Sequence, residues 1–222
     1  MKIQEINEKS MEFVREYLYS GVISDILDDL KLTKQVMHHS IRPIFHNAIV
    51  FGKVLTMLGI DDSNLKENPY ELELKAIDQL KPFQIVVAGT GNSTKSGFWG
   101  ELLTNIAIKN NCNGAVIDTF TRDTKKIIEL NYNLFCTGRC PRDSKNRTRV
   151  IDFNCKIECG DVLVNPGDLI FGDLDGIVVI PEEYHLEVLN KSYEKVEAEN
   201  IVRKDILKGI SAEDVYDKYG VL

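Results

Sequence analysis

The stretch that decides the fold is Glu101–Asp123, which reads Glu-Leu-Leu-Thr-Asn-Ile-Ala-Ile-Lys-Asn-Asn-Cys-Asn-Gly-Ala-Val-Ile-Asp-Thr-Phe-Thr-Arg-Asp. Its first part predicts an amphipathic helix beginning at or just before Glu101, because apolar residues recur at helical spacing: Leu102, Leu103, Ile106 and Ala107. Gly114 supplies a stop for that helix. The apolar run 115–117 is typical of a buried strand, and a second helix is expected to begin near Thr124.

The residues before this stretch complete a strand–helix–strand unit. The apolar run 84–88 predicts a strand, and a glycine-rich loop over 89–97 follows it. Glu101 then stands at one helix N-terminus, and Arg122 and Asp123 at the next, both at the carboxyl edge of neighbouring parallel strands. Carboxylates there suit a divalent cation, and an arginine with backbone amides suits an anionic substrate. A structural ion pair at a helix start is the alternative interpretation.

Composition narrows the class of protein. The chain has 222 residues, a net charge of −7 and a pI near 5.2, so it is not typical of a nucleic-acid-binding protein. No apolar run approaches the roughly 20 residues of a membrane-spanning helix. The first twenty residues carry four glutamates instead of a signal-peptide pattern. We therefore expect a cytoplasmic protein that binds no nucleic acid and no membrane.

Two further motifs allow alternatives. Cys136 and Cys140, and then Cys155 and Cys159, form pairs four residues apart that resemble zinc ligands. Residues four apart in an extended segment are separated by about 13 Å, too far to chelate one tetrahedral ion, so reduced thiols are the better interpretation. The loop Gly89–Gly91 lacks the third glycine of a dinucleotide-binding motif, and we expect its amides to face a small carboxylate.

The hydrophobic pattern predicts the remaining elements: two helices within 1–31, a long strand over 48–57 with a bend at Gly52, a helix over 70–80, short strands between 149 and 181, and a helix over 182–208. Gly209 ends the last of these helices, and Ser211 and Asp214 resemble a capping box. The expected organisation is an α/β domain over 1–181, followed by a helical tail over 182–222 that packs on a neighbouring protomer.

Several segments, in order along nearly the whole chain, resemble the RraA-like family: Ser24–Asp28, Ile41-Arg42-Pro43, Phe98–Leu103 with its Trp-Gly-Glu-Leu, Val164–Asp168 with Pro-Gly-Asp, and Asp173–Pro181 with Asp-x-Asp-Gly. Glu101 and Arg122-Asp123, with twenty residues between them, resemble the family's acid–spacer–Arg-Asp signature. The family includes class II 4-hydroxy-4-methyl-2-oxoglutarate/4-carboxy-4-hydroxy-2-oxoadipate aldolases. The resemblance implies a layered α/β sandwich, similar to phosphohistidine swivelling domains, with a central mixed sheet and a C-terminal helical tail.

The resemblance also implies a metal site. Asp123 would bind the cation directly and Glu101 through water, and an acidic residue of a neighbouring protomer's tail would bind through water. Glu199 is the best match for that residue, with Glu197 as the alternative. Carboxylate ligands without a suitable histidine or thiolate favour Mg²⁺ or Mn²⁺. The protomers of such aldolases form trimers or dimers of trimers, so a homotrimer or homohexamer is expected.

The implied reaction is cleavage of a 4-hydroxy-2-keto acid through a pyruvate enolate, with oxaloacetate decarboxylation from the same site. Arg122 would contact the pyruvyl unit, beside the substrate-binding residues Gly100, Leu102 and Leu103, with Glu101 and Asp123 also catalytic. A metal-bound water or hydroxide would take the proton of the 4-hydroxyl. Asp118-Thr119 departs from the family's usual Asp-Gly, which places an extra β-carbon and hydroxyl near the expected crevice.

Two other functions are open. Some members of the family inhibit ribonuclease E by protein contact, and the acidic chain is compatible with such a binding protein. A pure inhibitor, however, has no need for both acids and the arginine. The methyltransferase label that is sometimes attached to the family finds no support in a cofactor-binding strand–loop pattern here.

Overall fold

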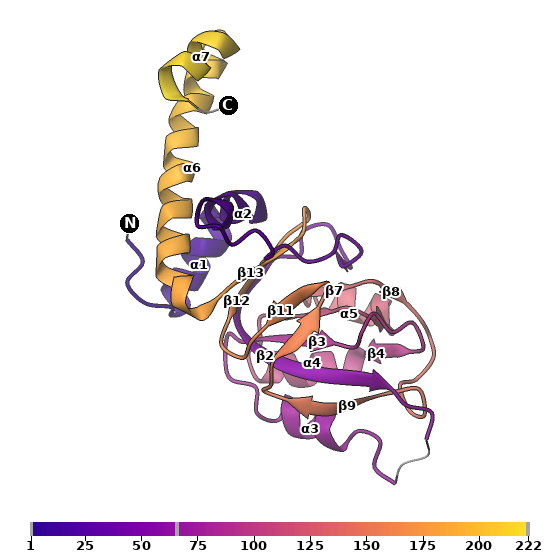
Figure 1. The fold of residues 1–222 in the computed structure, drawn as a ribbon. Coiled ribbons are helices and arrows are strands. Elements are labelled where there is room, and N and C mark those ends of the chain that lie inside the picture. The colour runs from indigo at the N-terminus through magenta and orange to yellow at the C-terminus, as the bar shows by residue number, and fades with distance from the viewer. Residues whose placement is uncertain (1, 65–66, 221–222) are drawn as a thin grey trace.

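A mixed sheet forms the centre of the computed structural model, which describes residues 2–64 and 67–220 (Figure 1). Seven strands lie in one row, in this order: β1 (Arg42–Pro43), β7 (Leu134–Cys136), β5 (Gly114–Ile117), β3 (Ile85–Gly89), β2 (Val50–Asp61), β12 (Leu169–Gly172) and β13 (Ile177–Ile180). An eighth strand, β9 (Thr148–Phe153), pairs with the far part of β2. The four strands from β7 to β2 are parallel, and their neighbours on both sides are antiparallel.

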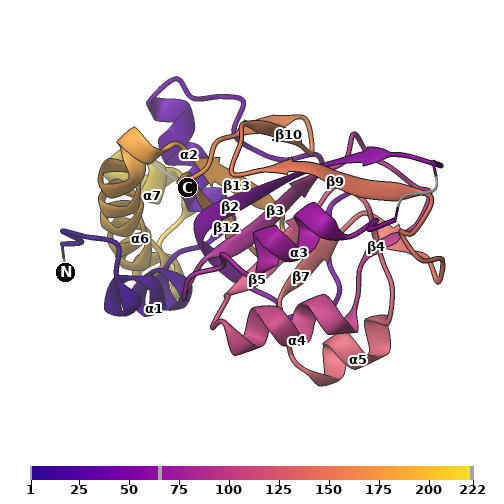
Figure 2. The same cartoon turned by 90° about the horizontal axis from the view of Figure 1, so that it is seen from below.

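The parallel strands are buried on both faces. Helices α3 (Glu71–Ile77), α4 (Glu101–Lys109) and α5 (Thr124–Glu129) cover one face, and the hairpin of β10 (Ile157–Cys159) and β11 (Val162–Val164) covers the other (Figure 2). Side chains of β2 and β3 alternate between the two hydrophobic clusters, as the period of two in a strand requires. Burial on both faces explains why 85–88 and 115–117 are continuous apolar runs.

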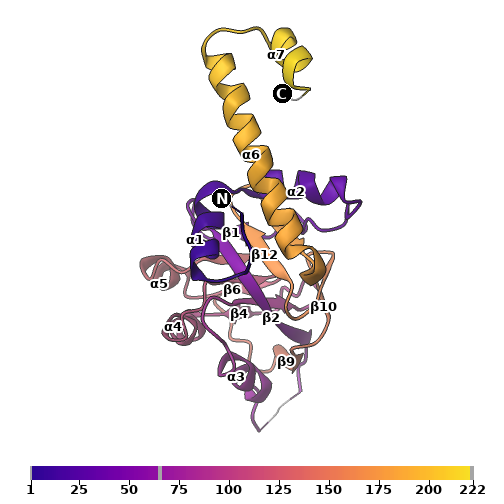
Figure 3. The ribbon, with the colours of Figure 1, turned by 90° about the vertical axis from the view of Figure 1, so that its left-hand side faces the viewer.

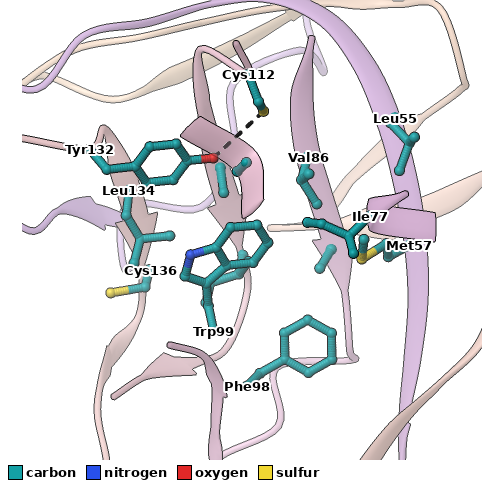
Figure 4. Close-up of a cluster of buried hydrophobic side chains, with 14 of the residues drawn as sticks. Leu55, Met57, Ile77, Val86, Phe98, Trp99, Cys112, Tyr132, Leu134 and Cys136 are labelled. Carbon is teal, nitrogen blue, oxygen red and sulfur yellow. Dashed lines mark hydrogen bonds between the residues drawn. The ribbon is translucent and has the colours of Figure 1, made fainter. Parts of the chain in front are cut away.

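A second, three-stranded parallel sheet follows the carboxyl ends of the central strands. It consists of β4 (Gly97–Trp99), β6 (Phe120–Thr121) and β8 (Gly138–Arg139), which follow β3, β5 and β7 in the chain. Trp99 packs under this sheet within the cluster drawn in Figure 4, stacked on Tyr132 at a centroid distance of 6.1 Å. Its indole N–H donates to Thr104 Oγ1 of α4 at 2.9 Å, which ties the small sheet to the helix.

The terminal helices pack together at the other side of the fold. Helices α1 (Glu8–Tyr17) and α2 (Ser20–Asp29) share a hydrophobic cluster with β12, β13 and the first half of α6 (His185–Leu207), which a short 3₁₀ turn (Glu182–Tyr184) precedes. The second half of α6 projects beyond the body and carries α7 (Ala212–Tyr219) (Figures 1 and 3). Ser211 caps α7, since its hydroxyl accepts from the Asp214 N–H at 3.1 Å.

The predicted fold class is confirmed: an α/β sheet structure with a C-terminal helical segment. At Gly52, where a bend was predicted, β2 pairs in regular register with β12, and its irregularity lies between Leu58 and Gly59 instead. An added Cβ at Gly52 would lie 2.2 Å from the Phe83 carbonyl oxygen. Close approach of backbone explains that glycine. All five cysteines are free thiols, as expected. In the described part of the chain, no helix is both long and apolar enough to cross a membrane.

Candidate active site

A cavity of about 300 Å³ opens between α3, the start of α4, β4 and the turn after β6. Arg122, Asp123, Gly100, Leu102 and Leu103 line it, so the structure brings together five of the residues predicted from the sequence. The predicted geometry is the reason: β3 and β5 are parallel neighbours, and the chain leaves both at the same edge of the sheet. Leu103 and Phe98 belong to the apolar wall, which packs on the cluster of Figure 4.

Asp123 joins the starts of two helices. It precedes α5 in the left-handed region, with φ of 55°, and its side chain makes no cap hydrogen bond to α5. Oδ2 instead accepts from the backbone N–H of Glu101, the first residue of α4, at 3.3 Å. Gly100 permits this contact, because an added Cβ would lie 3.0 Å from the same oxygen and 3.3 Å from Arg122 Cγ.

The Arg122 guanidinium lies between two carboxylates. Its Nε is 3.5 Å from Asp123 Oδ2, and its Nη1 is 3.5 Å from Asp143 Oδ1. The backbone N–H of Arg122 donates to the Trp99 carbonyl at 2.8 Å, which fixes the start of the side chain against β4. With a third of the side chain exposed, the planar fork faces the cavity and can bind the carboxylate or keto oxygen of a small acid.

Asp143 and Tyr70 complete this polar wall, and neither was predicted as a site residue. The Tyr70 hydroxyl donates to both carboxylate oxygens of Asp143, at 3.1 and 3.0 Å. Burial and this hydrogen bond raise the pKa of Tyr70 to about 12. Burial alone would raise the pKa of Asp143, but the Tyr70 hydroxyl, backbone amides and the Arg122 charge together lower it. Asp143 therefore stays ionised and orients Arg122.

Glu73 is a third cavity residue that the sequence interpretation missed. Its side chain is on the buried face of α3 and is only 7% exposed, yet it lines the cavity. Burial and the negative charge of Asp143 raise the pKa of Glu73 to about 7, although the Arg122 charge opposes this change. The sequence does contain a pattern that could have predicted its burial. Glu73 is four residues before Ile77 and seven before Leu80, which places it on the apolar face of the helix.

Glu101 is placed differently from the prediction. Its side chain is not part of the cavity wall: Oε1 accepts from the Asn105 amide at 2.6 Å, and Oε2 lies 4.0 Å from Lys126 Nζ. Its backbone N–H faces Asp123, but its carboxylate turns along α4.

Glu199 lies on α6, on the opposite side of the fold from β4 and α5 (Figures 1 and 2). In the same chain its carboxylate accepts from the Tyr19 hydroxyl. Glu197 is exposed and lies two positions earlier on α6, so its side chain points to a different face of the helix. A contribution of either residue to the cavity would therefore have to come from another protomer, as the resemblance implied.

Thr119 and the glycine-rich loop are structural, which corrects two expectations. Thr119 is fully buried and does not line the cavity; its hydroxyl donates to the Ser93 carbonyl at 2.6 Å. The amides of the loop face a carboxylate, but it is that of buried Asp118, which accepts from Thr90 N–H at 2.7 Å and Asn92 N–H at 3.2 Å. A side chain of the protein occupies the place expected for a substrate acid.

The donor set of the cavity fits a hard cation that keeps most of its water. Asp123 presents a partly exposed carboxylate, and Mg²⁺ in proteins is held by one or two carboxylates plus waters and substrate oxygens. Within residues 2–64 and 67–220, no group of three or more His, Cys, Asp or Glu side chains is arranged to hold a metal. An ion at Asp123 would depend on water, substrate or another protomer for its remaining ligands.

Comparison with known proteins agrees with this architecture. The sequence profile of the RraA-like family, described as Aldolase/RraA, matches residues 21–179. The chain belongs to the RraA-like family. The matched range includes the positions of all the cavity residues described above, and the Arg122-Asp123 turn among them.

Two relatives show the range of the family. A protein of Halalkalibacterium halodurans named "Putative 4-hydroxy-4-methyl-2-oxoglutarate aldolase" is 30% identical over 193 residues, covering 86% of each chain. Protein DlpA of Legionella pneumophila is 30% identical over 200 residues, which are 90% of this chain and 32% of that protein. The chain thus spans about a third of the length of DlpA.

Solved structures share the fold. An uncharacterised protein from Pseudomonas syringae pv. tomato superposes with a TM-score of 0.85 at 24% identity, covering 99% of this chain and 98% of that one. RraAS2 of Streptomyces coelicolor, described as an unusual member of the RNase ES inhibitor RraA family, superposes with a TM-score of 0.80 at 20% identity, covering 90% and 100%. At these identities the likeness establishes the fold.

Proposed function

We propose that this protein is a divalent-metal-dependent lyase of the pyruvate aldolase type. It would cleave a 4-hydroxy-2-keto acid such as 4-hydroxy-4-methyl-2-oxoglutarate and decarboxylate oxaloacetate. The observation that carries the proposal is the Arg122 guanidinium held between Asp123 and Asp143 on the wall of a cavity sized for a small acid. The name of the Halalkalibacterium halodurans relative agrees with this reaction class.

Each residue has a role that follows from its position. Arg122 binds the pyruvyl carboxylate or keto oxygen and stabilises the negative charge of the enolate that forms when the C3–C4 bond breaks. Asp143 and Tyr70 hold the guanidinium in place, and the N-terminus of α4, which begins at Glu101, adds its positive end to the cavity. Phe98 and Leu103 give the cavity an apolar wall beside the place of the reacting carbons, whereas Leu102 is exposed at its edge.

A Mg²⁺ or Mn²⁺ ion, when bound, would polarise the keto group as a Lewis acid. Asp123 is the residue that would hold it directly. Glu101 would take part through water only after its carboxylate leaves Asn105, and Glu199 only from another protomer.

The test is pyruvate release from oxaloacetate and from 4-hydroxy-4-methyl-2-oxoglutarate, measured with Mg²⁺, with Mn²⁺ and with EDTA. We expect metal-dependent pyruvate from both substrates and none in EDTA. Pyruvate release that is unaffected by EDTA would contradict the metal requirement. Absence of pyruvate from either substrate under all three conditions would contradict the proposal.

The second candidate is a binding protein that regulates ribonuclease E activity. The structural likeness to RraAS2 and the net charge of −7 favour it. Recovery of a ribonuclease in a pull-down, together with no turnover of any keto acid, would support this function instead.

A further inference from the structure

Glu73 occupies a position on α3 where the packing calls for an apolar side chain. Buried residues recur along this helix at i, i+3 and i+4: Glu73, Ala76 and Ile77. Ile77 is fully buried in the cluster of Figure 4, beside Phe98 and Val86. Because residues four apart share one helix face, the packing of Ile77 fixes the direction in which Glu73 points. The carboxyl group is therefore held rigidly at the cavity wall.

The Glu73 carboxyl makes no hydrogen bond to another residue within 2–64 and 67–220, and its oxygens are not fully enclosed, so they face the cavity although the residue is only 7% exposed. Buried carboxyl groups are normally hydrogen-bonded, because losing water without a replacement is costly. Tyr70, Asp143 and Arg122 satisfy one another on the neighbouring wall. The partner of the Glu73 carboxyl is therefore cavity water, or a ligand that displaces this water.

A ligand that displaces this water must present a hydrogen-bond donor to Glu73 while its acidic end lies at Arg122. A simple keto acid such as pyruvate or oxaloacetate carries carboxylates and a carbonyl, which are acceptors only. A 4-hydroxy-2-keto acid differs by one hydroxyl, and this hydroxyl is also the group that must lose its proton when the C3–C4 bond breaks.

We propose that Glu73 is the general base of aldol cleavage and accepts the proton of the substrate's 4-hydroxyl. This inference rests on the proposed function and assigns a residue of this chain to a proton transfer that the family resemblance gave to bound water. As the O–H bond breaks, C4 becomes a carbonyl carbon and the C3–C4 electron pair moves to C3, leaving the pyruvate enolate. Water then protonates C3, and Glu73 returns its proton to solvent, so the overall balance is substrate to pyruvate and a second keto acid.

The surroundings of Glu73 suit this role. The other titratable and charged groups on the same cavity are Tyr70, which precedes α3, Arg122 and Asp123 after β6, and Asp143 in the loop after β8. Asp143 and burial favour the protonated form of Glu73, whereas Arg122 favours the carboxylate. A pKa of about 7 lets the group both accept and release a proton near neutral pH, where a general base is most effective.

Decarboxylation of oxaloacetate passes through the same enolate, but oxaloacetate has no 4-hydroxyl to deprotonate. A variant that lacks a general base should therefore lose aldol cleavage alone, whereas a variant with a damaged structure should lose both reactions. In Glu73→Gln we expect kcat for aldol cleavage to fall about 10²- to 10⁴-fold, the usual contribution of a general base. The kcat for oxaloacetate should stay close to that of the parent protein. Glu73→Asp should recover part of the aldolase activity and shift its pH–rate profile.

The matched control is Glu71→Gln on the same helix, because Glu71 is exposed and pairs with Lys75 at 2.7 Å. It should change neither reaction. A second readout uses the protein without substrate. The parent should lose stability relative to Glu73→Gln as the pH rises from 5 to 8, since the folded state retains the Glu73 proton up to about pH 7 and the unfolded state loses it near 4.5.

The outcomes are distinguishable. Full aldolase activity in Glu73→Gln, or equal loss of both reactions, would overturn the assignment of Glu73 while leaving the proposed function in place through the parent's activity. A parent protein that decarboxylates oxaloacetate but cleaves no 4-hydroxy-2-keto acid would also overturn it. A parent that releases no pyruvate from either substrate would contradict the proposed function itself, and the role of Glu73 with it.

Discussion

The Arg122 guanidinium interacts with two carboxylates of the protein and, in the proposed function, with a ligand as well. Its Nε faces Asp123, its Nη1 faces Asp143, and the remaining edge of the fork is available to a ligand. A guanidinium can serve all three because its donors lie in one plane at fixed angles. An ammonium group is a point charge and can approach only part of this set. The two carboxylates therefore make the identity of residue 122 important as well as its charge.

We predict that Arg122→Lys lowers kcat for pyruvate release about 10²- to 10³-fold, the scale seen when one donor to a developing negative charge is removed. Steady-state kinetics with oxaloacetate checks this, with the melting temperature as a test of folding. Arg139→Lys is the control, since Arg139 ends strand β8 and its side chain reaches the Ile44 carbonyl instead of the cavity. Equal rates in Arg122→Lys and the parent would make Arg122 a structural residue.

At the scale of elements, the site depends on backbone segments that approach closely. Strand β2 lies against the loop before β3, and Gly52 leaves the room that the Phe83 carbonyl occupies. The reason for this glycine is steric, because its φ is not in the left-handed region. An added methyl group would push apart the strand and the loop that leads into β3.

We expect Gly52→Ala to destabilise the protein by about 1–3 kcal/mol, the usual cost of overpacking a core. For a protein of this length that corresponds to a fall in Tm of roughly 2–4 °C per kcal/mol. Gly21→Ala is the matched control: an added Cβ on α2 would meet Tyr19 at an ordinary distance of 3.5 Å, and alanine favours a helix. A thermal melt of Gly52→Ala that coincides with the parent's would contradict the steric explanation.

The long elements could be predicted from the sequence because each has a regular period or an uninterrupted apolar run. Strands β4, β6 and β8 could not, since segments of two or three residues contain no period to detect. The ends of β3 and β5 located Arg122 and Asp123, but the direction of the Glu101 carboxylate depends on Asn105 and Lys126 one turn away on α4 and across on α5. Glu73 was missed because a single acidic residue in a charged helix is usually exposed. Only the burial of Ile77 shows that Glu73, four residues before it, lies on the buried face of the helix.

At the scale of the whole molecule, the fold has a body and a projecting helix. Helix α6 has 23 residues and is about 34 Å long. Its first half is buried through Val188, Leu189 and Val196. Further along, Ile201 is 53% and Leu207 81% exposed, and both lie on the part that extends past the body (Figure 3). Apolar side chains on a projecting helix agree with the expectation that the tail packs on another protomer.

We therefore predict a homotrimer or homohexamer in solution, with a mass three or six times the 25.2 kDa of the chain. Light scattering after size exclusion measures this mass directly. Replacing Ile201 and Leu207 together with lysine should lower it, because charges do not pack in an apolar contact. A 25.2 kDa species for the parent at all concentrations would contradict the assembly and any role of Glu199 in a neighbour's site.

The hydrogen bond from the Glu101 N–H to Asp123 has a consequence for how the sequence can vary in length. It joins the first residue of α4 to the residue before α5, so everything between them forms a closed circuit of helix, strand and turn. An inserted or deleted residue in α4 or β5 would rotate or displace one end of that circuit and separate the carboxylate from its amide. The number of residues between Glu101 and Arg122, which is twenty, therefore determines the geometry of the site. The length of the spacer in the family signature matters for this reason, independently of which side chains it contains.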